Sequence, residues 1–444
     1  MNAKAICTNF DKDIYFKQID LKASSSRGLE SNVINVYPKL KKQLFLGFGA
    51  ALTESSTHCL DLLRDQSSDK LLKEVFDKNY NFLRIAIGSC DFALDSYSYS
   101  YKADLSDFSI EHEKKSLIKY LKKIKAINPD LKLLASPWSP PAFMKSNLRL
   151  TRGGHLNPIF KKTYAAYLGK YLLAMKEEGF EIDYISVQNE ASALVPWESC
   201  LYSAKDETSF AVKYLTPEIK KHNLKTKILI WDHNTDKIYS RASQSYEFEE
   251  KLTKSIFKRE SNIAGCAFHW YMGDHFDNIG LVAKKYPKKL LFHTEGCTGY
   301  SDFRKEDQLV NANIYAHDII GCLKNGTHAY IDWNLLLDHK GGPNHLENYC
   351  DAPLMLGKDS DSVIKNLTWT YINHFSSYIA AKSQIIETSS YTSDLEVVAA
   401  IRPDKKLALV ILNQANQAHD FNLIIENKAF KGQIDEKSII TILV

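Results

Sequence analysis

The sequence predicts a (β/α)8 barrel joined to a side β-sandwich that is built from both ends of the chain. Between residues 44 and 376, short apolar runs alternate eight times with amphipathic stretches. Residues 377–444 carry β-branched runs separated by turn residues instead. Strands buried on both faces are continuously apolar, and eight strand–helix repeats are typical of this barrel. We therefore expect residues 44–376 to form the barrel and residues 1–43 and 377–444 to form the sandwich.

The eight candidate barrel strands are short and rich in Ile, Leu, Val and Phe. They span residues 44–49, 82–87, 131–135, 184–188, 227–231, 264–270, 290–294 and 329–333. The clearest helical stretches between them are residues 114–127, 160–178, 208–222, 246–259 and 308–323. A doubly wound sheet would show the same alternation, but it would be expected to carry a glycine-rich phosphate turn, and neither usual form of that motif occurs. The alternation therefore favours the barrel.

The two chain ends have a different pattern. Residues 395–401, 407–412, 421–425 and 438–444 are alternating, β-branched runs, and turn residues such as 402–405 separate them. This is typical of short strands in an all-β module. Residues 12–40 also look extended, and we expect them to join the same module.

The composition is that of an ordinary soluble globular protein, with 44% hydrophobic and 25% charged residues. The net charge of +4 is small and scattered, which argues against a nucleic-acid partner. No run reaches the roughly 18 apolar residues of a membrane span, so we expect no transmembrane segment. The first residues lack an apolar signal segment. The expected location is cytoplasmic, or secreted or lysosomal if a leader has been removed.

Cysteine and histidine spacing predicts no metal and no cofactor. None of the eight cysteines forms a C-x-x-C pair, and no Cys/His spacing is typical of zinc. His269 and His293 also lack an acidic or cysteine partner at ligand spacing, so hydrogen-bonded histidines are the simpler interpretation. We expect reduced structural thiols, although an even cysteine count leaves disulfides open.

Two glutamates follow strand-like runs and carry the functional prediction. Glu190 comes after residues 183–189, and Glu295 comes after residues 290–294. In a (β/α)8 barrel, the C-terminal ends of the strands form the face where chemistry occurs. A glycosidase needs one acid/base carboxyl and one nucleophilic carboxylate beside the glycosidic bond. The pair therefore predicts a glycosidase cleft, whereas a single strand-end glutamate would be read as a solvated loop residue.

Six ordered motifs resemble glycoside hydrolase family 30, which includes glucosylceramidases, 1,6-β-glucanases and some β-xylosidases. They are residues 47–53 (Gly-Phe-Gly-Ala-Ala-Leu-Thr), 88–92 (Gly-Ser-Cys-Asp-Phe), 136–141 (Ser-Pro-Trp-Ser-Pro-Pro), 188–190 (Gln-Asn-Glu), 293–297 (His-Thr-Glu-Gly-Cys) and 332–344 (Asp-Trp-Asn-Leu-Leu-Leu-Asp-His-Lys-Gly-Gly-Pro-Asn). The resemblance implies a retaining mechanism. Glu190 would be the acid/base, and Glu295 would attack the anomeric carbon and form a covalent glycosyl-enzyme. The chemistry requires carboxyls about 5–5.5 Å apart, with Glu190 protonated in the free enzyme and Glu295 ionised.

The resemblance also implies roles for neighbouring residues. Asn189 would hydrogen-bond the sugar 2-hydroxyl, and Tyr271 would orient the nucleophile. Arg84 would place a fixed positive charge beside Glu295 and keep it ionised, although it could simply pair with a structural acid. His269 is expected to support the site.

The resemblance implies that three further residues would hold the sugar in the −1 subsite, and that a fourth would make a contact from a loop. Asp91 would accept sugar hydroxyls, and Trp138 and Trp333 would stack on apolar sugar faces or donate N–H bonds. Asn348 matches a more distant loop contact. Either tryptophan could instead be a core residue.

The chain departs from the family pattern at three positions. Ala191 follows the acid/base where proline is common, and Ala50 stands where glycine is common. His345 replaces an aromatic residue that glucosylceramidases tend to carry after Gly-Gly-Pro-Asn. The last change leaves the aglycone open.

We therefore expect a retaining β-glycosidase that acts on a β-linked glucoside, either a glycolipid or an oligosaccharide. A β-xylosidase of the same family is the alternative within enzymes, and a carbohydrate-binding barrel without turnover is the alternative outside them. A lipid substrate would call for exposed apolar loops and peripheral membrane contact, for which residues 140–144 and 194–197 are candidates. The sequence does not indicate an oligomeric state.

Overall fold

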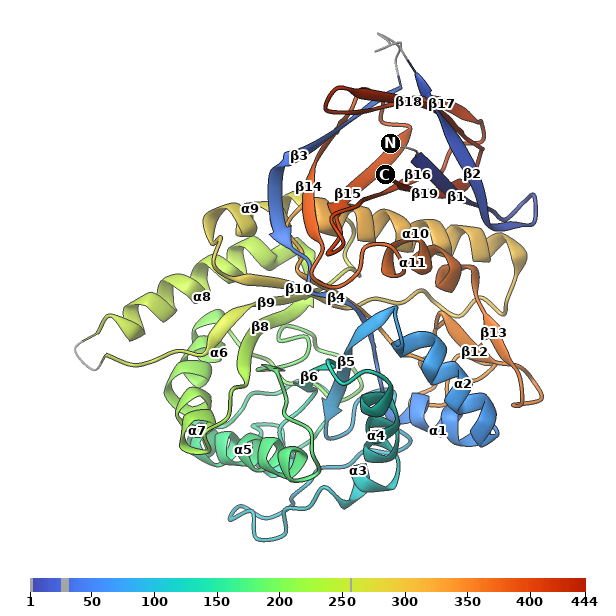
Figure 1. Cartoon of the computed structure of the whole chain (residues 1–444). Coiled ribbons are helices and arrows are strands. Elements are labelled where there is room, and N and C mark those ends of the chain that lie inside the picture. The colour runs from blue at the N-terminus through green and yellow to red at the C-terminus, as the bar shows by residue number, and fades with distance from the viewer. Residues whose placement is uncertain (1–2, 25–31, 256–257) are drawn as a thin grey trace.

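The computed structural model describes residues 3–24, 32–255 and 258–444. The predicted (β/α)8 barrel is confirmed, and a second β domain contains strands from both chain ends (Figure 1). Residues 25–31 of the predicted extended segment and residues 256–257 of the predicted helix 246–259 lie outside the described residues. Both chain ends lie in the β domain, beside each other in Figure 1.

The barrel consists of eight parallel strands, each hydrogen-bonded to the next. They are β4 (Gly47–Ala51), β5 (Tyr80–Ile87), β6 (Lys132–Pro137), β7 (Tyr184–Ser186), β8 (Lys227–Asn234), β9 (Ile263–His269), β10 (Leu290–Glu295) and β11 (Ala329–Asp332). The pairing of β11 with β4, which sets Asp332 opposite Ala50, closes the barrel. All eight C-terminal strand ends therefore surround one mouth.

Helices connect the strands on the outside of the barrel. They are α1 (Glu54–Leu62), α2 (Asp65–Phe76), α3 (Glu111–Lys115), α4 (Leu117–Ile127), η1 (Ala142–Met144), η2 (Pro158–Phe160), α5 (Lys161–Glu177), α6 (Ala204–Phe210), the π-helical turn η3 (Ala211–Leu215), α7 (Thr216–Lys221), η4 (Thr235–Lys237), α8 (Ile238–Thr253), α9 (Phe276–Lys285) and α10 (Lys305–Lys324). After β11 the chain forms the hairpin β12 (Leu354–Leu356) and β13 (Val363–Lys365) and then α11 (Leu367–Ser376). The predicted helix over residues 208–222 corresponds to α6, η3 and α7, which follow one another without a break.

An apolar layer fills the lower part of the barrel. Its core residues come from seven strands: Phe82, Leu134, Tyr184, Leu229, Ala267, Phe292, Ala329 and Ile331. The Phe292 ring packs edge-on against both Phe82 and Tyr184. The barrel is therefore a packed core at this level, and a ligand can enter only from the C-terminal mouth.

The β domain is a closed sheet. Its strands are β1 (Ala3–Asn9), β2 (Ile14–Ser24), β3 (Val33–Leu44), β14 (Gln384–Ser390), β15 (Leu395–Ile401), β16 (Leu407–Asn413), β17 (His419–Ile425), β18 (Lys428–Ile434) and β19 (Ser438–Leu443). They pair in the order β1-β19-β16-β15-β14-β3-β17-β18-β2, and β2 returns to β1. The N-terminal strands are thus integral to this domain, as predicted.

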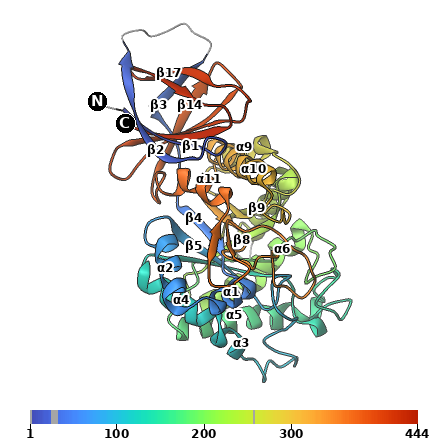
Figure 2. The ribbon, with the colours of Figure 1, turned by 90° about the vertical axis from the view of Figure 1, so that its right-hand side faces the viewer.

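Side-chain alternation explains how the β domain attaches to the barrel. Along β15, Val397 and Ala399 point into the core of the β domain, whereas Val398 and Ala400 join the barrel's own core cluster. Helices α10 and α11 lie between the two domains in both views (Figures 1 and 2). Because these strands are buried on both faces, they read as continuous apolar runs.

The junction also corrects one strand boundary. The first predicted barrel strand covered residues 44–49, but Leu44 pairs with Gln384 as the end of β3, and β4 begins at Gly47. Apolar residues continue across both elements, so hydrophobic pattern alone does not separate them.

No helix within the described ranges combines the length and the apolar character that crossing a bilayer requires.

Candidate active site

A cavity of about 310 Å³ opens at the C-terminal ends of the barrel strands. Its lining includes every residue predicted to act directly on substrate: Asp91, Trp138, Asn189, Glu190, Tyr271, Glu295, Trp333 and Asn348. Phe92, Trp197, Cys297, Thr298, Gly299, Tyr349 and Cys350 complete it. A larger hollow of about 590 Å³ lies between β3, α9 and the turn after α10, but it contains neither predicted catalytic glutamate. The chemistry-bearing residues therefore define the smaller cavity as the candidate site.

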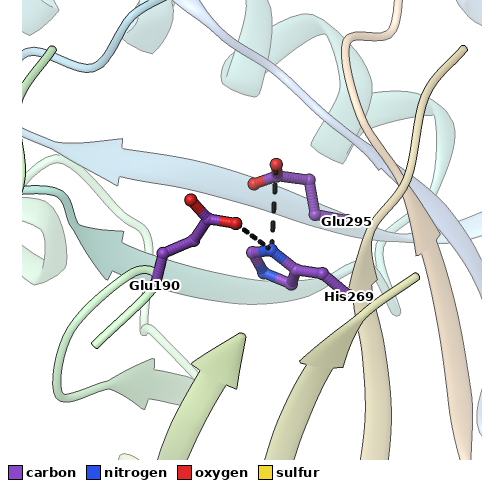
Figure 3. Close-up of side chains that lie close together, drawn as sticks. All are labelled: Glu190, His269 and Glu295. Atoms are coloured by element: carbon purple, nitrogen blue, oxygen red, sulfur yellow. Dashed lines mark hydrogen bonds and ion pairs between the residues drawn. The ribbon is translucent and has the colours of Figure 1, made fainter. Parts of the chain in front are cut away.

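The two glutamates face each other across this cavity (Figure 3). One carboxylate oxygen of Glu190, one of Glu295 and a ring nitrogen of His269 all lie within 4.8 Å of one another. Retaining glycosidases hold their carboxyls about 5–5.5 Å apart, and inverting enzymes about 6.5–9.5 Å apart. The spacing is therefore closer to the shorter of these two ranges.

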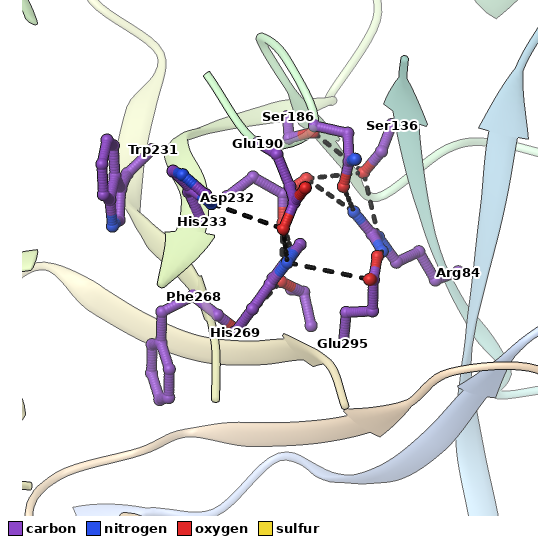
Figure 4. A network of polar contacts seen from close by, with 12 residues as sticks. Arg84, Ser136, Ser186, Glu190, Trp231, Asp232, His233, Phe268, His269 and Glu295 are labelled. Carbon is purple, nitrogen blue, oxygen red and sulfur yellow. Dashed lines mark hydrogen bonds and ion pairs between the residues drawn. The ribbon is translucent and has the colours of Figure 1, made fainter. Parts of the chain in front are cut away.

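Arg84 is fully buried below the cavity and connects the acidic groups. Its Nη1 donates to Glu295 Oε2 at 2.5 Å, and its Nη2 donates to Asn189 Oδ1 at 2.6 Å and to Asp232 Oδ2 at 2.9 Å (Figure 4). The guanidinium carbon also lies 4.8 Å from the ring centre of Trp138. One fixed cation thus sits against two carboxylates and fixes the orientation of both.

The other oxygen of Glu295 is also held. The hydroxyl of Tyr271 donates to Glu295 Oε1 at 3.0 Å and lies 3.5 Å from the thiol sulfur of Cys297. The amide oxygen of Asn189 accepts a hydrogen bond from Arg84. Its amide nitrogen is therefore the group that can donate to a ligand. Tyr271 and Arg84, the residues expected to orient the nucleophile and to place a positive charge beside it, thus both contact Glu295.

Asp232 is a fully buried carboxylate beneath the site. Its carboxylate accepts from Arg84, from Ser136 Oγ at 3.0 Å and from Thr294 Oγ1 at 2.6 Å. Burial alone would raise the pKa of Asp232, but the Arg84 guanidinium and His269 outweigh it and hold the pKa well below its usual range. An ionised Asp232 accepts hydrogen bonds only.

Asp232 therefore determines the orientation of His269. His269 Nε2 lies 3.2 Å from Asp232 Oδ1, so this nitrogen carries the proton in that contact. The opposite nitrogen, Nδ1, lies 3.3 Å from Glu190 Oε1 and 3.9 Å from Glu295 Oε1. Nδ1 can then donate to Glu190 when His269 is charged and accept from Glu190 when it is neutral.

The proton on this pair rests on the histidine in the free protein. Burial lowers the pKa of His269, but Glu295, Asp232 and Glu190 raise it to about 9. Burial raises the pKa of Glu190, but His233 and His269 lower it to about 2. A general acid that is protonated in the free enzyme was the requirement derived from sequence. The structure differs, because imidazoles beside Glu190 favour its ionised form.

The three predicted −1 subsite residues, Asp91, Trp138 and Trp333, line the same cavity as the loop residue Asn348. Trp138 and Trp333 stack with their ring centres 5.4 Å apart, and Asn348 Nδ2 donates to Asp91 Oδ2 at 3.3 Å. Burial, followed by the charges of Glu295 and Glu190, raises the pKa of Asp91 to about 8. Both tryptophans are almost fully buried, yet both line the cavity.

Left-handed backbone conformations place several of these groups. Glu190 has φ +49°, Trp231 +77° and Asp232 +44°, values that non-glycine residues seldom adopt. A bulge in β8 between Trp231 and His233 accompanies the last two, and the Glu190 N–H donates to the Asp232 carbonyl at 2.7 Å. Such conformations cluster at functional sites, where the surrounding contacts must hold them in place.

His345, the residue that departs from the family pattern, lies outside the cavity lining. Its Nε2 lies 3.5 Å from Glu198 Oε2, and Glu198 also accepts from Ser89 Oγ at 2.8 Å. The contact with Glu198 outweighs burial and raises the pKa of His345 to about 9. A charged pair therefore stands where an aromatic residue was expected.

Sequence reasoning left several site residues unassigned. Asp232 and His233 were visible only as polar residues at a strand end, and Ser136 was read only as part of a motif. Cys297 was read as a packing thiol, but it lines the cavity. All eight cysteines are free, and all except Cys297 are buried. The signal for Asp232 was its position at the end of the fifth barrel strand.

A barrel whose mouth holds two facing carboxylates, a buried arginine and stacked indoles belongs to the glycoside-hydrolase class. The family model described as "Glycosyl hydrolase family 30 TIM-barrel domain" matches residues 45–379. The model described as "Glycosyl hydrolase family 30 beta sandwich domain" matches residues 382–442. The chain therefore belongs to glycosyl hydrolase family 30 and is a glycoside hydrolase.

Named relatives divide between two substrates. The chain is 28% identical over 413 residues to a lysosomal acid glucosylceramidase of Mus musculus, covering 87% of this chain and 78% of the relative. It is 26% identical over 432 residues to an endo-1,6-β-D-glucanase of Neurospora crassa, covering 91% and 86%. Similarity at this level does not separate the two activities.

Solved structures match the chain over its full length. SrfJ from Salmonella typhimurium is 32% identical with a TM-score of 0.94, and the match covers 100% of this chain and 99% of that one. The endo-β1,6-glucanase BT3312 is 26% identical with a TM-score of 0.86, over 100% and 99%. The whole two-domain arrangement is therefore shared.

Proposed function

We propose that this glycoside hydrolase is a retaining β-glucosidase in which Glu295 is the nucleophile and Glu190 the acid/base. The observation that carries the proposal is the pair of carboxylates within 4.8 Å, with Glu295 held by Arg84 and Tyr271. In the first step, a Glu295 oxygen bonds to the anomeric carbon while Glu190 donates a proton to the departing oxygen. In the second step, Glu190 takes a proton from water, which attacks the same carbon and releases Glu295.

The proton for the first step comes from the Glu190–His269 pair. The pair holds this proton on the imidazole in the free protein, because the neighbouring carboxylates raise the pKa of His269 while His233 and His269 lower the pKa of Glu190. The 3.3 Å contact between Nδ1 and Oε1 lets this proton pass to Glu190 when a leaving oxygen accepts it. His269 is thus a positioning residue that stores the proton, and Glu190 is the group that delivers it.

The −1 subsite would recognise one sugar through groups of two kinds. Asp91 and the Asn189 amide offer hydrogen bonds to hydroxyls, and the stacked Trp138 and Trp333 offer an apolar wall. Hydrogen bonds to the 2-hydroxyl that strengthen in the transition state contribute several kcal/mol to such reactions. We assign glucose to this subsite on the strength of relatives named for glucosides.

For the aglycone we favour a glucosylceramide-like glycolipid. The connections that follow the barrel strands expose large apolar side chains, among them Leu148 at 70% and Leu194 at 72%. Tyr101, Met272 and Tyr349 are also exposed on loops at this end of the barrel. Such side chains suit an amphiphilic substrate at a lipid surface. A β-1,6-glucan is the second candidate, because both a fungal relative and a solved structure carry that activity in their names.

The experiment has two stages. Aryl β-D-glucoside and aryl β-D-xyloside distinguish the sugar, and we expect hydrolysis of the glucoside. Short-chain fluorescent glucosylceramide and β-1,6-linked glucan then distinguish the aglycone, and we expect a higher kcat/KM on the lipid. Preference for xyloside, or binding of both sugars without turnover, would overturn the assignment in favour of the two alternatives.

A further inference from the structure

The cleft presents three metal-ligating atoms to one point. Glu190 and Glu295 each offer a carboxylate oxygen, and His269 offers Nδ1 (Figure 3). All three atoms lie within 4.8 Å of one another, and His269 Nδ1 contacts both carboxylates, at 3.3 Å and 3.9 Å. An ion placed between them would meet one nitrogen and two oxygens.

His269 is preorganised as a metal ligand. Asp232 holds its Nε2 at 3.2 Å, and Arg84, Ser136 and Thr294 in turn hold Asp232. Metal-ligating histidines characteristically donate their other ring N–H to a carboxylate, which fixes the tautomer and increases ligand basicity. Once the second ring proton has left Nδ1 for solvent, the remaining proton stays on Nε2 and the lone pair of Nδ1 is directed at the two glutamates.

The local charge also suits a divalent cation. With an ion in place of the Nδ1 proton of His269, three carboxylates (Glu190, Glu295 and Asp232) are offset by one buried guanidinium, that of Arg84, which pairs with Glu295 and Asp232 (Figure 4). The other titratable groups that face the cleft are His233 from β8, Tyr271 after β9, Asp91 after β5 and Cys297 after β10. None of these adds a fixed positive charge.

His233 supplies an independent observation. Within the described part of the chain, its Nδ1 atom is buried and makes no hydrogen bond, although it lies 3.4 Å from Glu190 Oε1. A buried ring nitrogen without a partner calls for an explanation. It would stand as a further nitrogen donor beside the same carboxylate.

We propose that the catalytic cleft also binds a divalent transition-metal ion of the zinc class through Glu190, His269 and Glu295, and that this ion excludes substrate. Mixed imidazole and carboxylate donors with open positions suit zinc, whereas magnesium and calcium prefer all-oxygen shells. The ion is an inhibitor and not a requirement for turnover. The inference shares side chains with the proposed function, but it rests on donor geometry and not on the identity of the substrate.

Direct binding tests the site without any turnover. Isothermal titration of the chelator-treated full chain with zinc chloride should show one ion per chain, and magnesium chloride at the same concentrations should show none. Glu190→Gln and Glu295→Gln each remove a ligand without changing shape, and each should weaken zinc binding at least about tenfold. Equal thermal midpoints for these variants and wild type establish that they fold.

His317→Gln is the matched control. His317 also lies between two carboxylates, with Nδ1 2.6 Å from Glu396 Oε2 and Nε2 3.0 Å from Asp274 Oδ2, but it belongs to helix α10 and is not among the residues that line the cleft. We expect wild-type zinc affinity in this variant. Unchanged affinity in both glutamine variants, or its loss in His317→Gln, would overturn the proposal.

Kinetics then separates this inference from the proposed function. Zinc should raise KM without lowering kcat, and a chelator should reverse the effect. Zinc binding at the three residues in a protein that hydrolyses no glucoside would refute only the proposed function. Glucoside hydrolysis without zinc binding would refute only this inference.

Discussion

The interior of the barrel has two layers of side chains with different chemistry. On each strand, the inward-facing residues of the two layers lie two positions apart. In the lower layer, β5, β6 and β10 point Phe82, Leu134 and Phe292 inward. One step further along the same strands, the inward residues are Arg84, Ser136 and Thr294, and all are fully buried. Residues two apart on a strand share a face, so both layers occupy the same interior. The lower layer contributes stability by excluding water, whereas the upper layer buries charge to orient a reaction.

The comparison shows that charged and polar side chains can be buried in the upper layer of this barrel when they bind one another. Buried polar groups are costly unless they are satisfied, and in the upper layer Arg84, Asp232 and Thr294 satisfy one another. Glu295 contacts Arg84, Glu190 contacts His269, and both glutamates line the cavity. Substitutions in the lower layer should therefore mainly reduce stability, and substitutions in the upper layer should mainly reduce activity.

The largest effect is expected for Glu295→Gln at the top of the upper layer. The amide cannot form the glycosyl-enzyme, so we expect kcat to fall by several orders of magnitude. Substrate binding and the thermal midpoint should stay near wild type. Steady-state hydrolysis of an aryl β-glucoside measures the loss, and near wild-type turnover would contradict the role of Glu295.

Glu190→Ala should show a smaller loss that depends on the leaving group. Removing a general acid costs about 10²–10⁴-fold in rate. We expect the full loss on a substrate with a poor leaving group, and recovery with an activated aryl glucoside when azide is added. A uniform loss across leaving groups, without an azide product, would mean that Glu190 has another role.

In the lower layer, Phe292→Ala should damage stability and spare chemistry. Truncating a buried phenylalanine costs about 3–5 kcal/mol of unfolding free energy. Denaturant unfolding measures this loss, and kcat of the remaining folded protein should stay near wild type. Thr294→Val, two residues along the same strand, is the matched upper-layer variant. It removes the hydrogen bond to Asp232, and we expect it to cost less stability, about 1.5–3 kcal/mol, but to lower kcat.

The smallest expected effect is a displaced pH profile in His269→Asn. In wild type, the pair loses its last proton as pH rises through the pKa of His269, which is raised to about 9, so the alkaline limb of kcat/KM should lie near that value. Without the imidazole, the proton is lost with the pKa of Glu190 alone, and the limb should move to lower pH by about one unit or more.

Asp91→Asn provides the control for that profile, because the pKa of Asp91 is raised to about 8 by burial and titrates nearby. We expect this variant to raise KM and to leave the alkaline limb in place. If the alkaline limb moved in Asp91→Asn and not in His269→Asn, the stored proton would belong to Asp91, and the role given to His269 would be contradicted.

Much of this architecture was predictable from the sequence. Apolar runs indicated the barrel strands, and strand-end polarity with family resemblance indicated Glu190, Glu295 and the residues that line the cavity. The role of Asp232 was not predictable, because it depends on a bulge and a left-handed turn in β8 that no local pattern signals. The proton on His269 was also hidden, because its pKa results from three carboxylates that converge from different strands.

The central claim is that Glu295 forms a covalent bond to a β-glucosyl group, and one measurement tests it most directly. The protein is treated with a 2-deoxy-2-fluoro-β-glucosyl fluoride, digested and analysed by mass spectrometry. The account predicts a fluoroglucosyl adduct on Glu295 that is absent in Glu295→Gln. An adduct on another carboxylate, or a first-formed product of inverted configuration, would contradict it.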